Sequence, residues 1–202
     1  MTLLRSHLLG TVPWIDHGFG TRHGGDSQDG MASLQQIHSE RCLIVAAPGC
    51  AGEGDALITD RPGVPVSVRT ADCFPILLAD LRRRTVAAIH AGWRGTAARI
   101  VSVTIGRMRT ECKTDPADIV AAIGPGIGAC CYEVGEEVAQ RFGRRAGHLD
   151  LAGANRAQLV EAGVPEGRIE VLGLCTLCEP ARFHSYRRDG EAAGRMVSFI
   201  AL

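Results

Sequence analysis

The sequence predicts a single α/β domain, with some α+β character, in which helices flank a mixed β-sheet. Three features support this prediction. Short apolar runs separated by Gly, Pro and Asp are typical of strands, two longer segments have helical periodicity, and two central apolar runs are joined by a short polar turn. A chain of 202 residues can bury one complete core, so we expect one domain over residues 1–202.

The predicted strands are short and lie throughout the chain. They cover residues 43–46, 56–59, 64–68, 74–78, 85–89, 119–123, 168–172 and 196–200. The turn at residues 80–84 is too short for the crossover that parallel strands need. It therefore predicts an antiparallel hairpin between the two runs that flank it.

Three helices are expected. Thr96 is a candidate N-cap for a helix that ends near Cys112 and has apolar side chains on one face. Asp150 is a candidate cap for a second helix, which the Gly-Val-Pro sequence at residues 163–165 should end. A shorter third helix is predicted over residues 135–142.

The composition argues against several kinds of partner. The net charge is +0, so no overall field attracts nucleic acid or an anionic membrane, and only 4% of the residues are aromatic. The first residues lack the apolar run of a signal peptide, and no stretch reaches the length of a membrane helix. We therefore expect a cytoplasmic enzyme for small molecules, monomeric or weakly dimeric, whose eight cysteines are reduced or metal-bound.

Three residues indicate a catalytic metal site: His38, Cys73 and His90. Zinc binds Cys sulfur and His nitrogen, and three protein ligands leave the open position that catalytic zinc requires. Cys73 and His90 lie at the outer ends of the predicted hairpin, so pairing of its strands would bring them together. The sequence does not place His38 relative to this pair. For each residue taken singly, a buried cysteine or an ordinary histidine is the commoner explanation.

Polar residues beside these ligands are candidates for chemistry. Asp72 precedes Cys73 and is a candidate for proton transfer, although a turn residue is the simpler interpretation. Arg94 follows His90 in the sequence His-Ala-Gly-Trp-Arg-Gly, and its alternative role is a surface ion pair. The small residues of this segment, such as Gly92, would let the backbone approach a ligand closely.

Four further cysteines offer a closed structural zinc site, but the sequence does not favour one. Cys175 and Cys178 form a single C-x-x-C, whereas a zinc ribbon needs two such pairs. Cys130 and Cys131 are adjacent, and adjacent side chains diverge in a strand. A redox C-x-x-C is a further alternative, but no clear helix start accompanies it. The glycine-rich residues 124–128 match no phosphate-loop pattern and are interpreted as a tight turn.

Several motifs together resemble the YfiH/YlmD family, also called laccase-domain, multicopper polyphenol oxidoreductase or peptidoglycan editing factor proteins. In chain order they are residues 18–25 (GFGTRHGG), 70–73 (TADC), 90–95 (HAGWRG), 123–128 (IGPGIG), 131–134 (CYEV) and 185–189 (SYRRD). The resemblance covers about residues 18–200 and implies a YfiH-like fold. One departure is the stretch at residues 25–35, which is shorter than usual where the family has a loop that helps to form the pocket.

The resemblance implies that His38, Cys73 and His90 bind zinc beside a purine nucleoside site. The implied reactions are phosphorolysis of adenosine, inosine and S-methyl-5'-thioadenosine, with deamination of adenosine. It also implies that Cys175 lies near the pocket without a metal role. The predicted site residues are Asp72, Cys73 and Arg94 for catalysis, and Arg22, Arg69 and Arg187 for substrate or phosphate binding.

Two other reactions would use the same residues. Two His and one Cys also occur at copper sites, which makes copper the alternative cofactor and phenol oxidation an alternative reaction. A multicopper cluster needs many imidazoles, however, and the chain has seven histidines without a His-x-His pair. The second alternative is an amidase or esterase that edits a cell-wall precursor, with zinc polarising a carbonyl.

Overall fold

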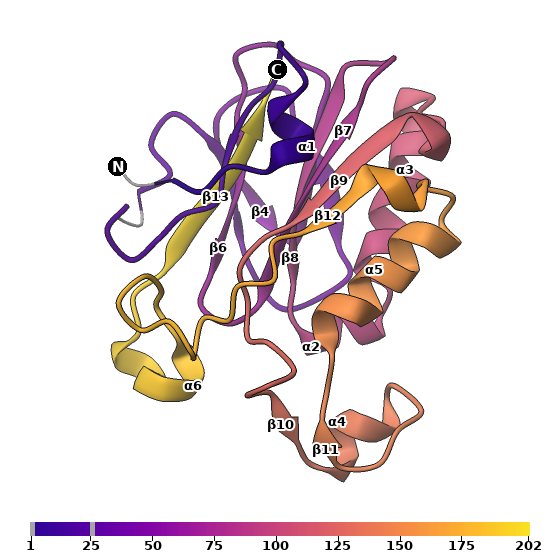
Figure 1. Cartoon of the computed structure of the whole chain (residues 1–202). Helices are drawn as coiled ribbons and strands as arrows, with labels where there is room; N and C mark the ends of the chain where they lie inside the picture. Colours follow the sequence, from indigo (N-terminus) through magenta and orange to yellow (C-terminus); the bar gives the residue numbers. More distant parts are fainter. Residues whose placement is uncertain (1–2, 25–26) are drawn as a thin grey trace.

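The computed structural model describes residues 3–24 and 27–202, which fold into three layers (Figure 1). A five-stranded sheet packs on a six-stranded sheet, and helices α3 (Ile100–Cys112) and α5 (Leu151–Glu161) cover the outer face of the larger sheet. The predicted mixed α/β fold is confirmed, but its strands form two mixed sheets instead of one. A small ribbon of β10 (Glu133–Val134) and β11 (Gly147–His148) lies apart from both.

The smaller sheet contains most of the strands that the sequence did not reveal. Its order is β1 (Asp16–Gly18), β13 (Met196–Ala201), β6 (Val66–Thr70), β2 (Ala32–Gln35) and β4 (Gly49–Glu53). The first three strands pair antiparallel, and β6, β2 and β4 pair parallel. β1, β2 and β4 are short and polar or glycine-rich, and β4 is exposed along its whole length, so they carry no apolar signal.

The larger sheet contains the predicted hairpin at its centre. Its order is β12 (Ile169–Val171), β9 (Ile119–Ile123), β7 (Phe74–Asp80), β8 (Thr85–Ala91), β5 (Ala56–Thr59) and β3 (Cys42–Ile44). β7 and β8 pair antiparallel, as expected, and Pro75 lies opposite His90. The central strands are antiparallel, and the two edge strands pair parallel with their neighbours.

Strand β7 belongs to both layers of the core. Ile76 and Leu78 pack under α3 and α5, whereas Leu77 and Ala79 pack against the smaller sheet. Alternate residues of a strand point to opposite faces, and both faces of this strand are covered. This explains why the sequence shows a continuous apolar run here instead of an alternating one.

The first predicted helix is divided in two, which is a correction to the sequence analysis. Helix α2 (Trp93–Ala97) begins directly after Gly92, which is its N-cap, and Thr96 lies inside it. Arg99 then has a left-handed conformation, with φ of 65°, and redirects the chain into α3. Thr96 is buried, and its hydroxyl donates to Oδ1 of Asn155 at 3.2 Å.

The other helices agree better with the prediction. Asp150 caps α5, because its Oδ1 accepts the backbone N–H of Gly153 at 2.8 Å. The predicted helix at residues 135–142 is α4 (Glu136–Gln140). The remaining helices are α1 (His7–Gly10) and α6 (Tyr186–Asp189), with 3-10 turns η1 (Pro116–Asp118), η2 (Glu166–Arg168) and η3 (Gly190–Ala192). Among the described residues, no helix is long and apolar enough to cross a membrane.

Candidate active site

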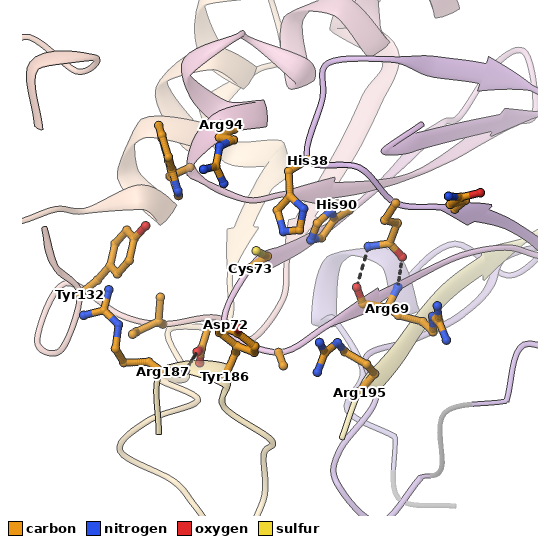
Figure 2. Close-up of a pocket in the computed structure, with 15 residues that line it drawn as sticks. His38, Arg69, Asp72, Cys73, His90, Arg94, Tyr132, Tyr186, Arg187 and Arg195 are labelled. Atoms are coloured by element: carbon orange, nitrogen blue, oxygen red, sulfur yellow. Dashed lines mark hydrogen bonds between the residues drawn. The ribbon is translucent and has the colours of Figure 1, made fainter. Parts of the chain in front are cut away.

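His38, Cys73 and His90 meet where the chain crosses from the smaller sheet to the larger one (Figure 2). Their potential ligand atoms all lie within 4.8 Å of one another, and the two imidazole centroids are 4.9 Å apart. Cys73 directly precedes β7 and His90 lies in β8, so the predicted proximity of this pair is confirmed. His38 follows β2 and approaches from the other sheet, which the sequence alone could not show.

A buried carboxylate that the sequence analysis missed orients two of these residues. Asp55 is 0% exposed, and its Oδ1 accepts hydrogen bonds from Nδ1 of His90 at 2.8 Å and from the backbone N–H of His38 at 3.0 Å. Its Oδ2 accepts the backbone N–H and the hydroxyl of Ser39, at 2.6 and 2.8 Å. In the sequence, Asp55 ends a Glu-Gly-Asp segment at residues 53–55, directly before a short strand. No motif distinguishes it from a turn residue.

The backbone around the site is unusual. Only five described non-glycine residues have positive φ, and two of them are site residues, His38 with φ of 61° and Asp72 with φ of 84°. Gly92 packs directly against the site: a Cβ added there would lie 2.9 Å from Sγ of Cys73 and 3.2 Å from Cδ2 of His38. The backbone at this glycine therefore lies close to two candidate metal ligands, and its approach to a bound substrate stays a prediction.

The charges in the site favour a thiolate. Burial raises the pKa of Cys73. The positive charge of His90 and hydrogen bonds from both histidines outweigh this effect and lower the pKa to about 6. Burial likewise lowers the pKa of His90, but the thiolate and Asp55 raise it to about 9. Burial and the Cys73 charge raise the pKa of Tyr132 to about 12, so its phenol keeps its proton.

The three donors fit a metal such as zinc. Nδ1 of His90 is hydrogen-bonded to Asp55, so Nε2 on the Cys73 side of the ring is the nitrogen that would coordinate a metal, which is the usual arrangement of carboxylate, histidine and metal. Two imidazoles and a thiolate are zinc ligands in tetrahedral geometry, with a fourth position open. Copper also accepts this donor set, so the chemistry of the ligands alone does not choose between the two metals.

A pocket of about 750 Å³ opens beside these three residues. Four arginines line it, namely Arg69, Arg94, Arg187 and Arg195, together with Trp93, Tyr132 and Tyr186 (Figure 2). The guanidinium of one arginine lies over each of these aromatic rings. The distances from its Cζ to the ring centroid are 4.5 Å for Arg94 on Trp93, 5.3 Å for Arg187 on Tyr132 and 5.9 Å for Arg195 on Tyr186. The pocket thus combines positive charge with flat apolar surfaces.

Asp72 is the one carboxylate among the described residues that line this pocket. Its Oδ1 accepts the hydroxyl of Thr176 at 2.6 Å, and its Oδ2 accepts the backbone N–H of Arg187 at 2.6 Å. These hydrogen bonds fasten the loop after β12 and helix α6 to the residue next to Cys73. Gln36 similarly holds the backbone of Arg69 through two hydrogen bonds of 2.8 Å (Figure 2).

The predicted residues are not all brought together. Asp72, Cys73, Arg94, Arg69 and Arg187 all line the pocket with the two histidines. Arg22 does not line it, and its guanidinium instead donates to the carbonyl of Pro180. The shortened stretch that begins at residue 25 lies partly outside the described residues, as does the last glycine of the motif at residues 18–25.

The glycine-rich turn at residues 124–128 serves packing. A Cβ on Gly124 would lie 2.2 Å from the ring of Phe19, and one on Gly126 would lie 2.6 Å from the ring of Phe74. These contacts explain why glycine is needed at both positions without invoking a bound ligand. Ile127 lines the pocket, so the turn still contributes to its wall.

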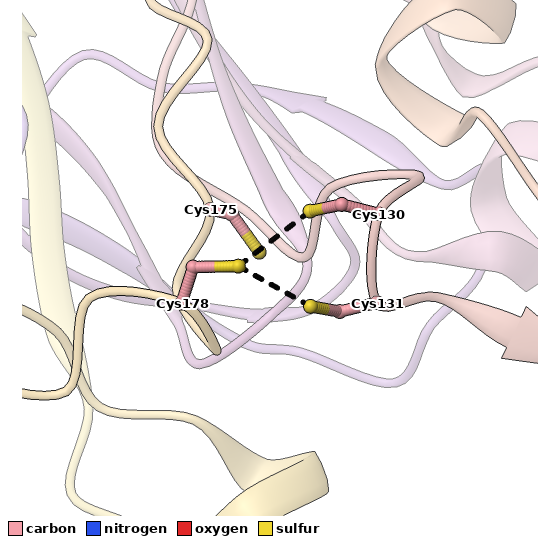
Figure 3. A group of neighbouring side chains, drawn as sticks. All are labelled: Cys130, Cys131, Cys175 and Cys178. Atoms are coloured by element: carbon pink, nitrogen blue, oxygen red, sulfur yellow. Dashed lines mark hydrogen bonds between the residues drawn. The ribbon is translucent and has the colours of Figure 1, made fainter.

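The expectation that Cys130 and Cys131 diverge is wrong. Residues 129–131 form a turn, not a strand, and both thiols face the thiols of Cys175 and Cys178 (Figure 3). The four sulfurs lie within 4.8 Å of one another. The sequence offered no signal for this turn beyond the glycine that precedes it.

Fold and site together define the class of protein. It is a mixed α/β protein with a candidate metal site of two histidines and one cysteine in a pocket lined by arginines. A family model described as multi-copper polyphenol oxidoreductase laccase matches residues 18–202. The chain therefore belongs to this family, which is the YfiH/YlmD family whose motifs the sequence resembles.

Relatives with assigned activities extend this result. A purine nucleoside phosphorylase from Deinococcus radiodurans is 46% identical over 190 residues, which cover 88% of this chain and 72% of that protein. A purine nucleoside phosphorylase from Bacteroides thetaiotaomicron is 42% identical over 163 residues. The match covers 73% of this chain and 60% of the Bacteroides protein. Adenosine deaminase RL5, from an unknown prokaryotic organism, is 40% identical over 79% of this chain and 67% of its own.

Solved structures confirm the fold. YlmD from Geobacillus stearothermophilus superposes with a TM-score of 0.91 and 30% identity, covering 100% of this chain and 96% of that one. The Bacillus licheniformis protein YfiH superposes with a TM-score of 0.87 and 31% identity, covering 93% of this chain and 92% of that one.

Proposed function

We propose that this chain is a metal-dependent purine nucleoside phosphorylase. It would use inorganic phosphate to cleave the bond between purine and ribose, giving the free base and ribose 1-phosphate. The observation that carries the proposal is a single pocket in which His38, Cys73 and His90 lie beside four arginines and three aromatic rings. Adenosine, inosine and S-methyl-5'-thioadenosine are the proposed substrates, as the family resemblance implies. Two relatives named purine nucleoside phosphorylase support this class of reaction.

The arginines and aromatic rings suit the two reactants. Phosphate carries negative charge, which Arg69, Arg94 and Arg187 would neutralise through charge-assisted hydrogen bonds. A purine is flat, and Trp93, Tyr132 and Tyr186 offer faces on which it could stack. The protonated phenol of Tyr132 also provides a donor for a purine or ribose oxygen.

Zinc is the proposed cofactor, held by His38, Cys73 and His90, where it would provide a fixed positive charge that orients phosphate and stabilises negative charge. Asp55 would keep the imidazole of His90 and the backbone of His38 in position for this role. Asp72 is the proposed proton-transfer residue, because it is the carboxylate that faces the pocket. Its hydrogen bonds to Thr176 and Arg187 would hold the carboxylate in one orientation.

Deamination of adenosine is the second proposed activity, and the identity of 40% with adenosine deaminase RL5 favours it. The same aromatic and polar groups would hold the purine, with water in the place of phosphate. This reaction consumes no phosphate and releases ammonia. Phosphate dependence and ammonia release therefore separate the two activities in one preparation.

The proposal is tested by incubating the purified protein with inosine and with adenosine, each with and without phosphate. We expect phosphate-dependent release of hypoxanthine and adenine, and a Cys73→Ala variant that loses turnover and the zinc ion held by His38, Cys73 and His90. Cys112→Ala, which alters a half-buried cysteine on α3, is the control and should keep both. Unchanged zinc content and turnover in Cys73→Ala would contradict the assignment.

The two other reactions are tested with the same preparation. Copper in protein purified without added copper, together with oxygen consumption on a phenol, would support an oxidase instead. Hydrolysis of a muramyl-type substrate faster than phosphorolysis of nucleosides would support a cell-wall editing enzyme.

A further inference from the structure

A cluster of four cysteines lies beside the pocket, formed by two loops that are distant in sequence (Figure 3). Cys130 and Cys131 come from the turn after β9, and Cys175 and Cys178 from the loop after β12. The Sγ atom of Cys178 is 3.3 Å from that of Cys131 and 3.6 Å from that of Cys130. All four sulfurs lie within 4.8 Å of one another, so each thiol faces the other three.

The local backbone favours this convergence. Gly128 donates its backbone N–H to Sγ of Cys175 at 3.3 Å, and the N–H groups of Leu177 and Cys178 also hydrogen-bond this sulfur. Several N–H donors on one sulfur stabilise a thiolate. Gly128 also allows the close approach, because a Cβ there would lie 3.2 Å from Sγ of Cys130 and 3.3 Å from Cβ of Cys175.

The spacing of the sulfurs fits a single tetrahedral ion. Metal–sulfur bonds of about 2.3 Å place the four sulfurs of a tetrahedron about 3.8 Å apart. The measured 3.3 and 3.6 Å are close to this value and well above the ~2.05 Å of a disulfide bond. An iron–sulfur cluster has several irons and sulfides between its cysteines and needs a wider set of sulfurs.

We propose that Cys130, Cys131, Cys175 and Cys178 bind a second Zn²⁺ ion in a closed, structural site. Four thiolates with no open position are the usual ligand set of structural zinc. Binding exchanges four thiol protons for one Zn²⁺ and transfers no electrons. The resulting complex takes no chemical part in the reaction at His38, Cys73 and His90.

The position of this second site gives it a clear role. Tyr132 follows Cys131 directly and lines the pocket, and Thr176 follows Cys175 and donates to Asp72. An ion that joins the two loops would therefore hold one wall of the pocket against the segment that carries Cys73. The ion would act on the reaction only through the shape of this wall.

Metal content and thiol accessibility together test the proposal. Protein purified under reducing conditions without added metal should contain two zinc ions per chain by mass spectrometry. Cys178→Ser and Cys130→Ser, which alter exposed cysteines, should each contain one. Cys73→Ala should also contain one, and that ion should be released when a mercurial reagent titrates the thiols.

Alkylation of the wild-type protein provides a test that needs no variant. Cys130 and Cys178 are exposed, yet bound zinc should protect them from maleimide until a strong chelator is added. Cys50, an exposed cysteine on β4, is the matched control and should react with or without chelator.

Four results would overturn the proposal. The first is that Cys178→Ser and Cys130→Ser both keep the zinc content of the wild type, and the second is that the native protein alkylates at Cys130 and Cys178 as fast as at Cys50. A mass two daltons lower per cysteine pair would indicate a disulfide, and iron or copper in place of zinc would exclude the assigned ion.

Discussion

Nδ1 of His90 donates a hydrogen bond of 2.8 Å to Oδ1 of Asp55, and the same oxygen accepts the backbone N–H of His38. One buried carboxylate thus orients two candidate metal ligands that come from different sheets. Burial raises the pKa of Asp55, but hydrogen bonds from His90 and Ser39 lower it below its ordinary value. The carboxylate is therefore charged in the folded protein, which suits a partner of metal-binding histidines.

Replacing this carboxylate should weaken metal binding. Asp55→Asn keeps one oxygen but places an amide N–H₂ among N–H donors, so one or more hydrogen bonds to His38, Ser39 or His90 is lost. We expect the affinity for zinc at this site to fall about 10- to 100-fold, measured by competition with a chromophoric chelator.

Asp80→Asn is the matched control. Asp80 is also fully buried, and it accepts backbone N–H groups of Arg82 and Arg83 at the opposite end of the same hairpin. This variant should lose stability but keep the zinc affinity of the wild type. Equal losses of zinc affinity in the two variants would show that Asp55 acts through general stability alone.

A methyl group at Gly92 should also disturb the metal site. Gly92 has φ of −80°, so alanine meets no backbone strain, but its Cβ would lie 2.9 Å from Sγ of Cys73. Either the sulfur or helix α2 must shift, and we expect zinc affinity to fall on the order of tenfold. Metal titration of Gly92→Ala measures this.

Gly106→Ala provides the comparison, because nothing lies within 4 Å of a Cβ at this position in α3. It should keep zinc affinity and gain up to about 1 kcal/mol of stability from better helix propensity. If Gly92→Ala bound zinc as tightly as Gly106→Ala, the packing of Gly92 against Cys73 would have no role in the site.

The hairpin explains how much of the site was predictable. A short turn between two apolar runs fixes the register of β7 and β8, and this places Cys73 near His90 from sequence alone. His38 and Asp55 were not predictable in this way. They reach the site through contacts between elements of two sheets, and β2 is too short and polar to show an apolar pattern.

The same distinction holds for the rest of the fold. Asp150 was identifiable as a helix cap because capping depends on neighbours three residues away. The break at Arg99 was not, because nothing in its residue type requires a left-handed conformation. The convergence of Cys130 and Cys131 on Cys175 and Cys178 likewise depends on a turn and on a distant loop.

The arginines in the pocket should govern phosphate binding. Arg94→Gln removes a charge that lines the pocket beside His38 and Cys73. A charge-assisted hydrogen bond contributes about 1.5 to 3 kcal/mol, so we expect KM for phosphate to rise about 10- to 100-fold. Steady-state kinetics with varied phosphate at saturating inosine measures this, and KM for inosine should change much less.

Arg22→Gln tests whether Arg22 binds phosphate, as the family resemblance implies, or lies outside the site, as its position in the structure indicates. The resemblance places Arg22 near phosphate, but its guanidinium donates to the carbonyl of Pro180 outside the pocket lining. We expect its KM for phosphate to stay within about twofold of the wild type. A rise as large as that of Arg94→Gln would show that Arg22 reaches the phosphate during turnover.

Acid should destabilise the fold through His17, which does not line the pocket beside the metal site. The imidazole is 2% exposed, its Nε2 accepts the backbone N–H of Ser6 at 2.9 Å, and its buried Nδ1 has no partner in the described part of the chain. Burial and the charge of Arg5 lower its pKa, and the opposing charges of Asp16 and Glu170 do not restore it. The folded protein therefore keeps this ring neutral at a pH where the unfolded chain takes up a proton.

The sign of the pH effect follows from this difference. Below about pH 6.5 the unfolded chain binds a proton at His17 that the folded protein does not, so the free energy of unfolding falls as pH falls. His17→Gln removes the titration and keeps an oxygen that can accept the N–H of Ser6. Urea denaturation at pH 7.5 and 5.5 should therefore show a smaller acid-induced loss in His17→Gln than in the wild type, whereas equal losses would assign the acid sensitivity to other groups.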